Sequence, residues 1–433
     1  MREGFTVKLW DSKKLPADWF RRQQADQKAT LELEHNVRAI ITQVKVEGDK
    51  ALVEFARKFD DAELTSRALK VKPEEIKEAY TKISTDQVSA LRCMKEKVWD
   101  FQKQLLMLTE VKSTNEGVTV QTKLRPLESV GCYVPGGQAA YPSTLVMTAV
   151  PAKVAGVPRI VICSPSDSKG KVNPLVLVAA DICNVNEIYK IGGAQAIAAL
   201  AYGTKTIAPV RKIVGPGSKY VTAAKVLIST DVAIDMPAGP SEVLVLADES
   251  ADPRLIAYDM ISQAEHGGDS VAGLITNSQK ISIAVQENLF RLADSTPRRE
   301  KVAESLDKYG FIIICRGMEE MISLANQFAP EHLEVMTDNA KEIAEKLVAG
   351  LVLIGPYSPV ALSDYASGTN HVLPTGGFAQ SFSGLSAFDF LRRASIVEST
   401  RTGLERVQDS VKIMTDAENL PNHYRAIAAR FQK

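Results

Sequence analysis

The chain has 433 residues, of which 45% are hydrophobic and 24% are charged, a composition typical of a globular protein with two or three domains. Lys+Arg and Asp+Glu both number 52, so the charge balance gives no reason to expect a nucleic acid or a membrane surface as a partner. The first residues lack the apolar core of a signal peptide and no window is apolar enough to span a membrane, so we expect a cytoplasmic protein. The five cysteines form no CxxC pair, which disfavours disulfides and thiolate zinc sites.

The first third of the chain is predicted to be mostly helical. Residues 1–30 are polar, contain Trp10 and Trp19, which we expect to be exposed, and are predicted to form an N-terminal arm. Residues 31–110 repeat apolar side chains at steps of three and four, which predicts a layer of amphipathic helices. Residues 111–131 alternate as strands do and lead into a glycine-containing loop.

From residue 159 onward, short apolar strand candidates alternate with helical segments. The predicted strands are 159–164, 187–191, 212–214, 242–247, 272–276, 311–315, 332–336 and 350–354. Because they are continuously apolar, they predict an α/β fold with parallel sheets covered on both faces. The break at residues 236–240 and the helical layer favour two sheet domains over a single barrel. After about residue 380 the alternation stops, and polar helices are predicted to form a tail that docks elsewhere.

Three glycine loops are candidates for binding a nucleotide. They are Pro135-Gly136-Gly137, Gly192-Gly193-Ala194-Gln195 and Gly215-Pro216-Gly217-Ser218. Glycine turns at the starts of helices offer free N–H groups to a phosphate, and parallel sheets place ligand loops at the carboxyl ends of their strands. None of the loops is a complete GxGxxG motif, so each is also compatible with ordinary turn chemistry. Two such loops in one half of the chain nevertheless favour a nucleotide.

Gln263 and His266 form a candidate half of a metal site. They lie three residues apart near the end of a helix predicted over 252–266, so their side chains share one side of it. An amide oxygen and an imidazole can both bind a metal. The alternative is a polar helix end, with His266 stabilising the helix dipole.

Other polar side chains lie in segments that resemble binding loops. Glu331 and His332 adjoin at the start of a predicted strand, and a carboxylate beside an imidazole provides two proton carriers with different pKa values. Asp364 and His371 share the loop LSDYASGTNHVLPTGG, which is too polar to be core and is predicted to bind a ligand. His35 is predicted to be a surface residue of the first helix.

Several segments together resemble the histidinol dehydrogenase family from about residue 30 to 425. They include GCYVPGG, YKIGGAQAIAALAYGT, GPGSKYV, IDMPAGPSEVLV, QAEHGGDS, FAPEHLE, LSDYASGTNHVLPTGG and AENLPNH. The resemblance implies two Rossmann-like, aldehyde-dehydrogenase-like parallel-sheet domains. The expected parts are an arm (1–30), a metal- and substrate-binding domain (31–125 plus 240–380), an NAD-binding domain (126–239) and a helical tail (381–433) that docks on the partner in a homodimer with shared active sites.

The resemblance also implies a reaction and its residues. The reaction is the oxidation of L-histidinol through L-histidinal to L-histidine, the last steps of histidine biosynthesis, with NAD and one zinc ion per subunit. The implied zinc ligands are Gln263, His266, Asp364 and His423, and the implied catalytic bases are Glu331 and His332. The implied substrate-binding residues are Ser241, Gln263, His266, His332, Asp364, His371, Glu418 and His423. The implied NAD-binding residues are Tyr133, Gln195 and Ser218.

Two departures from the family pattern leave alternatives open. Ser218 stands where the family usually has asparagine, and residues 376–385 lack the usual basic residue near Gln380. A paralogue that oxidises another alcohol, such as a sulfonated diol, is therefore the second interpretation. A zinc hydrolase and a non-catalytic binding protein are more remote alternatives. Cys132 and Cys163 are available for a cysteine-dependent aldehyde step, but an apolar setting and the lack of a neighbouring base disfavour them.

Overall fold

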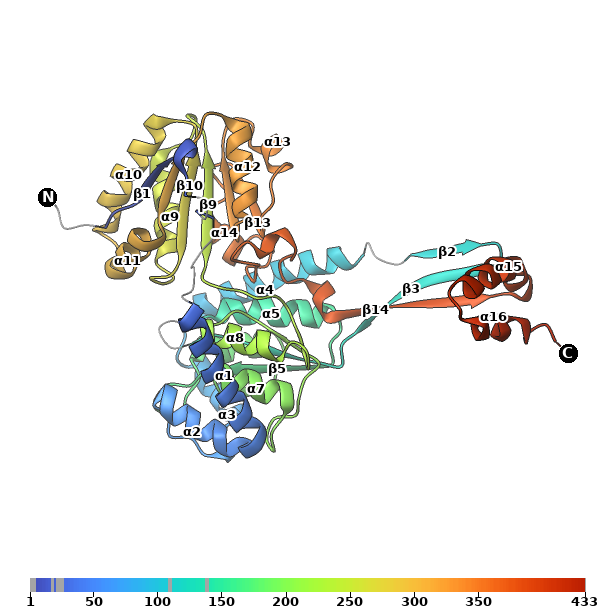
Figure 1. Cartoon of the computed structure of the whole chain (residues 1–433). Helices are drawn as coiled ribbons and strands as arrows, with labels where there is room; N and C mark the ends of the chain where they lie inside the picture. Colours follow the sequence, from blue (N-terminus) through green and yellow to red (C-terminus); the bar gives the residue numbers. More distant parts are fainter. Residues whose placement is uncertain (1–4, 17–18, 21–26, 108–110, 137–139, 433) are drawn as a thin grey trace.

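The computed structural model describes residues 5–16, 19–20, 27–107, 111–136 and 140–432. Two lobes, each built on a parallel sheet, lie one above the other in Figure 1, and a long antiparallel ribbon extends away from both. The α/β class and the two parallel sheets predicted from the apolar runs are confirmed. Of the helices described, none combines the length and the apolar character needed to cross a membrane.

The first lobe contains a six-stranded parallel sheet with the order β1-β11-β10-β9-β12-β13. Its strands are β1 (Lys8–Asp11), β9 (Glu242–Ala247), β10 (Val271–Thr276), β11 (Phe311–Ile314), β12 (His332–Met336) and β13 (Leu351–Ile354). Its helices are α9 (Pro253–Ala264), α10 (Gln279–Ala293), α11 (Arg299–Tyr309), α12 (Met318–Phe328), α13 (Ala340–Ala344) and α14 (Val360–Tyr365). Every residue of β9 and β10 is buried, because helices cover both faces of these central strands.

The second lobe contains a five-stranded parallel sheet with the order β6-β5-β4-β7-β8. Its strands are β4 (Ser129–Tyr133), β5 (Arg159–Ser164), β6 (Glu187–Lys190), β7 (Lys212–Val214) and β8 (Ala233–Ile234). Its helices are α1 (Gln27–Glu47), α2 (Asp49–Asp60), α3 (Pro73–Tyr80), α4 (Thr85–Leu106), α5 (Pro142–Val154), α6 (Pro174–Ile182), α7 (Gly193–Tyr202) and α8 (Lys219–Ile228).

The N-terminal helical layer packs on this five-stranded sheet. The apolar side chains of α3 and α4 join the core with α5 and α6, and those of α1 and α2 join the core with α7 and α8 on the other face. The expected grouping of residues 31–125 with 240–380 therefore does not match the packing. The apolar periodicity showed that these helices needed a partner surface, but it could not identify which sheet supplied it.

The N-terminal arm is anchored to the first lobe. Its strand β1 pairs in parallel with β11 at the edge of the six-stranded sheet. The Trp10 ring stacks on Phe311 with centroids 5.8 Å apart, and the Trp19 ring stacks on Phe328 at 5.7 Å. Both tryptophans are therefore half-buried, and the expectation that they are exposed was wrong.

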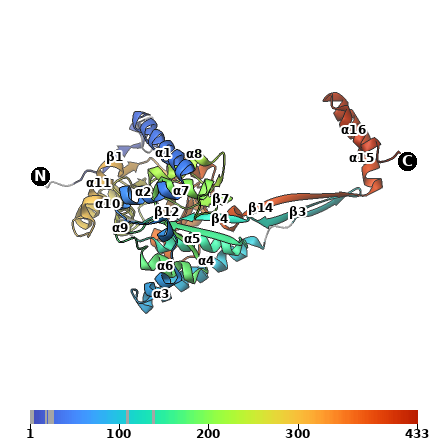
Figure 2. The same ribbon diagram turned by 90° about the horizontal axis from the view of Figure 1, so that it is seen from below.

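The ribbon consists of β2 (Lys112–Asn115), β3 (Val118–Pro126) and β14 (Leu391–Ser399), and it carries α15 (Arg401–Ala417) and α16 (Pro421–Ala428). Figures 1 and 2 show both helices at its far end, away from the two lobes. Residues 391–399 were expected to be helical, but they pair antiparallel with β3 along the whole strand. The local sequence is compatible with a helix or a strand, and pairing with β3 selects the strand.

A buried ion pair stabilises the second lobe beside the loop that follows β7. The amine of Lys225 pairs with Asp235, and their side chains are 3% and 1% exposed. The same amine donates to the Gly215 carbonyl at 2.9 Å, and the Asp235 carboxylate accepts from the Gly215 N–H at 2.8 Å. This pair holds the Gly215 loop against the sheet.

We expect Asp235→Asn to lower the free energy of unfolding by about 3–5 kcal/mol, because it leaves the Lys225 charge buried without a counter-charge. The matched control is Glu128→Gln, which removes the exposed ion pair with Arg211 and should cost less than about 1 kcal/mol. Chemical or thermal unfolding measures both changes. Equal losses in the two variants would contradict the structural role of the buried pair.

Candidate functional site

Glu331 and His332 lie together at the amino-terminal edge of the six-stranded sheet. β12 begins at His332, between β9 and β13, and the two residues are 7% and 3% exposed. The Oε2 atom of Glu331 is 3.6 Å from Nδ1 of His332. Two side chains that would point to opposite faces in a regular strand therefore meet at the irregular strand entrance.

The surroundings of the His332 ring indicate which nitrogen is available for proton transfer. Nδ1 lies 3.2 Å from the main-chain oxygen of Glu242. A carbonyl oxygen only accepts, so in the neutral ring Nδ1 carries the hydrogen and Nε2 is the basic nitrogen. Nε2 faces Oδ1 of Asp364 at 3.6 Å, and both atoms are buried without a hydrogen-bond partner in the described residues. A polar ligand or a cation would satisfy them.

Burial shifts the proton affinities of this cluster. It raises the pKa of Glu331 to about 8. The charge of His332 lowers this pKa, whereas the charges of Glu242 and Asp364 raise it. Burial lowers the pKa of His332, but Glu331 and Asp364 outweigh this effect and raise it to about 9. Burial also acts to raise the pKa of Asp364, but His332 and the other nearby imidazoles hold it below its ordinary value. The cluster therefore exchanges protons with solvent in the mildly alkaline range.

Helix α9 brings Gln263 and His266 to the same edge of the sheet. Asp252 caps its N-terminus, and the helix runs back along the sheet, so its last turn reaches the start of β10. Gln263 is buried, whereas His266 follows the helix and retains accessible surface. Although His266 is exposed, desolvation lowers its pKa, and the charge of Asp364 opposes this shift.

The loop 366–377 connects this cluster to the other lobe. The Nδ1 atom of His371 lies 3.3 Å from the Asp364 carbonyl, and its Nε2 lies 3.5 Å from the Thr144 hydroxyl on α5. Asn370 donates from its amide to the Met147 carbonyl on α5 at 2.7 Å. Ser241, which precedes β9, is half-buried in the neighbouring segment. The loop therefore spans both lobes beside the Glu331–His332 pair.

The predicted nucleotide residues lie at the carboxyl edge of the five-stranded sheet. Tyr133 ends β4, and its hydroxyl accepts the N–H of Gly193 at 3.0 Å. The side chain of Gln195 on α7 is buried with an unpartnered Oε1 atom. Ser218 occupies the N-cap position of α8, is exposed, and makes no capping hydrogen bond with its side chain. Gly137, from the loop Pro135-Gly136-Gly137, lies outside the described residues.

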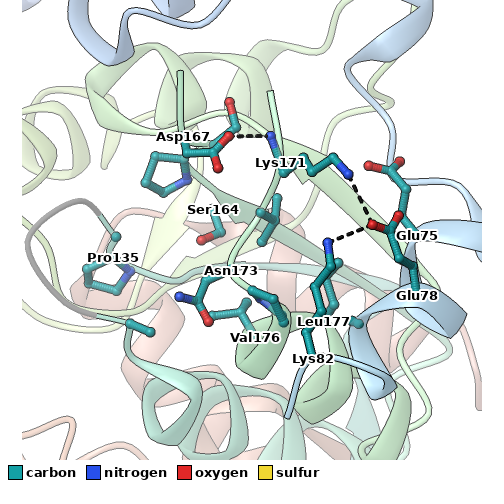
Figure 3. Close-up of a pocket in the computed structure, with 17 residues that line it drawn as sticks. Glu75, Glu78, Lys82, Pro135, Ser164, Asp167, Lys171, Asn173, Val176 and Leu177 are labelled. Atoms are coloured by element: carbon teal, nitrogen blue, oxygen red, sulfur yellow. Dashed lines mark hydrogen bonds and ion pairs between the residues drawn. The ribbon is translucent and has the colours of Figure 1, made fainter. Parts of the chain in front are cut away.

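One cavity lies apart from the ionisable cluster. It encloses about 500 Å³ beside the ends of β4 and β5, between α3 and α6 (Figure 3). Lys82 and Lys171 in its lining both pair with Glu78, at 2.6 and 3.1 Å. Glu75 and Asp167 also line it, so the carboxylates of the lining outnumber its amines. We therefore do not place a phosphate in it.

A second cavity of about 390 Å³ lies between the lobes. Its lining runs from α4 and the start of α5 to the end of α9 and includes Tyr141, His266, Arg298 and Tyr365. This cavity adjoins the ionisable cluster, so a ligand held at the second lobe can approach the cluster through it.

Glu418 and His423 are not part of this cluster. Both are exposed at the end of α15 and on α16, beyond the ribbon. Across the residues that the structure describes, no three His, Cys, Asp or Glu side chains converge on one metal position. Within one chain, the predicted ligand set is therefore divided between the lobes and the tail.

Cys132 and Cys163 are not suited to act as nucleophiles. Cys132 and Cys163 are both fully buried within the five-stranded sheet. Burial raises the pKa of Cys132 to about 12 and raises that of Cys163 as well, so neither is a thiolate near neutral pH.

The sequence analysis did not identify Glu242. It begins β9, is 2% exposed, and contacts the backbone or side chains of both Glu331 and His332. The signal was present in SEVLVLA, because a carboxylate beginning a fully apolar strand requires buried partners.

Comparisons with known proteins show the family to which the chain belongs. The family model described as "Histidinol dehydrogenase" matches residues 21–431. The chain is 46% identical to a histidinol dehydrogenase of Bacteroides thetaiotaomicron over 396 residues, covering 91% of this chain and 92% of the relative. It is 42% identical to one of Methanosarcina mazei over 397 residues, covering 91% of each. The crystal structure of histidinol dehydrogenase from Elizabethkingia anophelis superposes with a TM-score of 0.92 at 35% identity, covering 99% of both chains. The chain belongs to the histidinol dehydrogenase family of oxidoreductases.

Proposed function

We propose that this protein oxidises L-histidinol through L-histidinal to L-histidine, with NAD+ as oxidant and a zinc ion in the site. The observation that carries the proposal is the buried pair of unpartnered atoms, His332 Nε2 and Asp364 Oδ1, beside the Glu331 carboxyl group. The relatives in the family bear the name of this activity. A base, a carboxylate ligand and a second proton carrier are the groups that such an oxidation requires.

The donor set fits a zinc ion. Gln263 and Asp364 would provide oxygen ligands and His266 a nitrogen ligand, and the unpartnered Oδ1 of Asp364 leaves a lone pair for a cation. His423 would complete the set from a second copy of the chain. When bound, the zinc ion would supply Lewis acidity at the substrate oxygen, and NAD+ would take up the hydride.

The residues of this chain would then move the protons. Nε2 of His332 takes the hydroxyl proton of the alcohol as its carbon gives up hydride, while the Glu242 carbonyl holds Nδ1–H in place. Glu331 takes a proton from the water that adds to the aldehyde, and the hydrated aldehyde gives up a second hydride to a second NAD+. His371 and Ser241 flank the substrate, and burial of the cluster keeps bulk water out.

The NAD+ site would lie along the carboxyl edge of the five-stranded sheet. Tyr133 ends β4, Gln195 lies in the first turn of α7 after β6, and Ser218 is the N-cap of α8 after β7. The Gln195 amide and the Ser218 hydroxyl have bonding capacity left for a ligand. Serine retains a donor and an acceptor where the family usually has asparagine. The nicotinamide would enter the cavity between the lobes, whose lining includes Tyr141 at the start of α5 and His266 after α9.

The tail would belong to the site of a partner subunit. Figures 1 and 2 place α15 and α16 far from the lobes of their own chain, and Ile413, Met414 and Leu420 are exposed on them. A projecting element with exposed apolar side chains gains most by docking on a symmetric copy. In such a homodimer, each site would receive Glu418 and His423 from the other chain.

Substrate choice is tested first by a panel of alcohols. With NAD+ and zinc, we expect NADH formation from L-histidinol and L-histidinal and much slower turnover of sulfonated diols. Absorbance at 340 nm measures the rates, and product analysis should show two NADH per histidinol. Faster oxidation of another alcohol would support a paralogue with a different substrate, and hydrolysis without NADH would support a zinc hydrolase.

We expect Glu331→Gln to slow the oxidation of histidinal by about 100-fold or more, with a smaller effect on histidinol oxidation to the aldehyde, because only the second step must deprotonate water. Since burial raises the pKa of Glu331 to about 8, its carboxylate is present mainly above that pH. The wild-type rate with histidinal should therefore rise with pH through that range, and the variant should lose this rise. Single-turnover rates of each step provide the measurement. Equal losses in both steps would mean that another group activates the water.

Mixing inactive subunits tests the shared site. His266→Ala and His423→Ala homodimers should each be inactive, but after subunit exchange one site of every mixed dimer contains both imidazoles. With random pairing, roughly a quarter of the wild-type activity should return. Exchange is verified with two differently labelled chains. Complete exchange without recovered activity would show that the tail serves its own chain.

A further inference from the structure

Glu242 is a buried carboxylate located directly beside the pair of bases. It begins β9, and the register of His332 opposite Val243 on the neighbouring strand places Glu242 beside Glu331. It is 2% exposed, although the rest of β9 is apolar. Burial of a carboxylate is costly unless hydrogen bonds compensate for lost water, so its contacts indicate its role.

The side chain of Glu242 connects two separate parts of the site. Its Oε1 accepts the N–H of Gly376, in the loop that carries His371, at 3.0 Å. Its Oε2 accepts the N–H of Glu331 at 3.3 Å. The side chain therefore joins the start of β12 to the 366–377 loop.

The backbone of Glu242 contacts both bases directly. Its N–H donates to Oε2 of Glu331 at 2.8 Å, which makes the contact between the two glutamates reciprocal. Its carbonyl oxygen lies 3.2 Å from Nδ1 of His332. If β9 shifted relative to β12, the Glu331 carboxyl group and the His332 ring would both be displaced.

We propose that Glu242 is a positioning residue that locks the Glu331 carboxyl group and the Gly376 segment in the geometry required to add water to the aldehyde. This inference rests on the proposed function. Glu242 acts through Glu331 and does not itself transfer a proton. Its carboxylate accepts the N–H groups of Glu331 and Gly376, which fixes the Glu331 backbone relative to the Gly376 segment. The backbone N–H of Glu242 donates to Oε2 of Glu331 and sets the rotamer of that side chain.

The competing explanation is that Glu242 only stabilises the fold. That role predicts lower stability with no preference between the two oxidation steps. It also predicts that the effect of removing Glu242 is independent of Glu331. The two roles therefore differ in step selectivity and in additivity, both of which can be measured.

The primary test is Glu242→Gln. Glutamine retains the size, but its amide can accept only one of the two N–H groups and presents an N–H₂ donor to the other. We expect kcat with histidinal to fall by about 10- to 100-fold, as for displaced reacting groups, while KM for NAD+ stays unchanged. Hydrogen–deuterium exchange should be faster at the Gly376 amide. The matched control is Glu187→Gln, which removes a carboxylate from the start of β6, where it pairs with Arg159, and should leave both rates unchanged.

A double-mutant cycle decides between the two roles. In the Glu331→Gln background, adding Glu242→Gln should cost little further histidinal oxidation, because the group that it positions is already absent. A full additive loss, or an equal loss in both steps, would overturn the proposal. Should Glu242→Gln fail to fold, Glu242→Asp gives the same cycle, since it retains the charge but withdraws the carboxylate by one methylene.

The same measurements separate this inference from the proposed function. Wild-type protein that oxidises neither histidinol nor histidinal would refute the function, and the exchange rate at Gly376 would still test the contact. Wild-type turnover with unaltered kinetics and exchange in Glu242→Gln would refute only the role of Glu242.

Discussion

The burial of ionisable groups at the amino-terminal edge of the six-stranded sheet is the constraint on which the site depends. Glu242, Glu331 and His332 are at most 7% exposed, so protein atoms must replace the water around them. Glu242 and Glu331 replace part of this water for each other, because the carboxylate of each accepts the backbone N–H of the other. Among the described residues of this cluster, Nε2 of His332 and Oδ1 of Asp364 are buried without a hydrogen bond and face each other at 3.6 Å. The buried network leaves unsatisfied the two atoms at which a ligand is expected.

The two parallel sheets contribute opposite edges to one region. The five-stranded sheet presents the carboxyl ends of β4, β6 and β7, where ligand loops of open α/β sheets usually lie. The six-stranded sheet presents the amino ends of β9 and β12. Its helix α9 runs back along the sheet, so Gln263 and His266 reach the same amino edge. The 366–377 loop contacts α5 of the other lobe through Asn370 and His371.

The ribbon holds the terminal helices α15 and α16 away from the two lobes. Its strands β3 and β14 are joined along nine residues, a length that carries the terminal helices beyond the reach of their own lobes. Apolar side chains on those helices remain exposed within one chain, and exposed apolar surface favours association. The division of candidate ligands between lobes and tail has the same origin, since His423 belongs to α16, which lies at the far end of this ribbon.

The sequence by itself determined the features that depend on local order. Continuous apolar runs predicted the central strands to within one residue, because a strand buried on both faces is apolar at most of its positions. The i, i+3 spacing of Gln263 and His266 and the adjacency of Glu331 and His332 are likewise local, so these pairs could be named before any contact was known. The tertiary structure alone decided which sheet the N-terminal helices cover and that residues 391–399 form a strand. It also decided that Glu242 contacts Glu331, which lies 89 residues further along the chain. These outcomes depend on pairings between distant segments, and local periodicity indicates that a surface will be buried without specifying its partner.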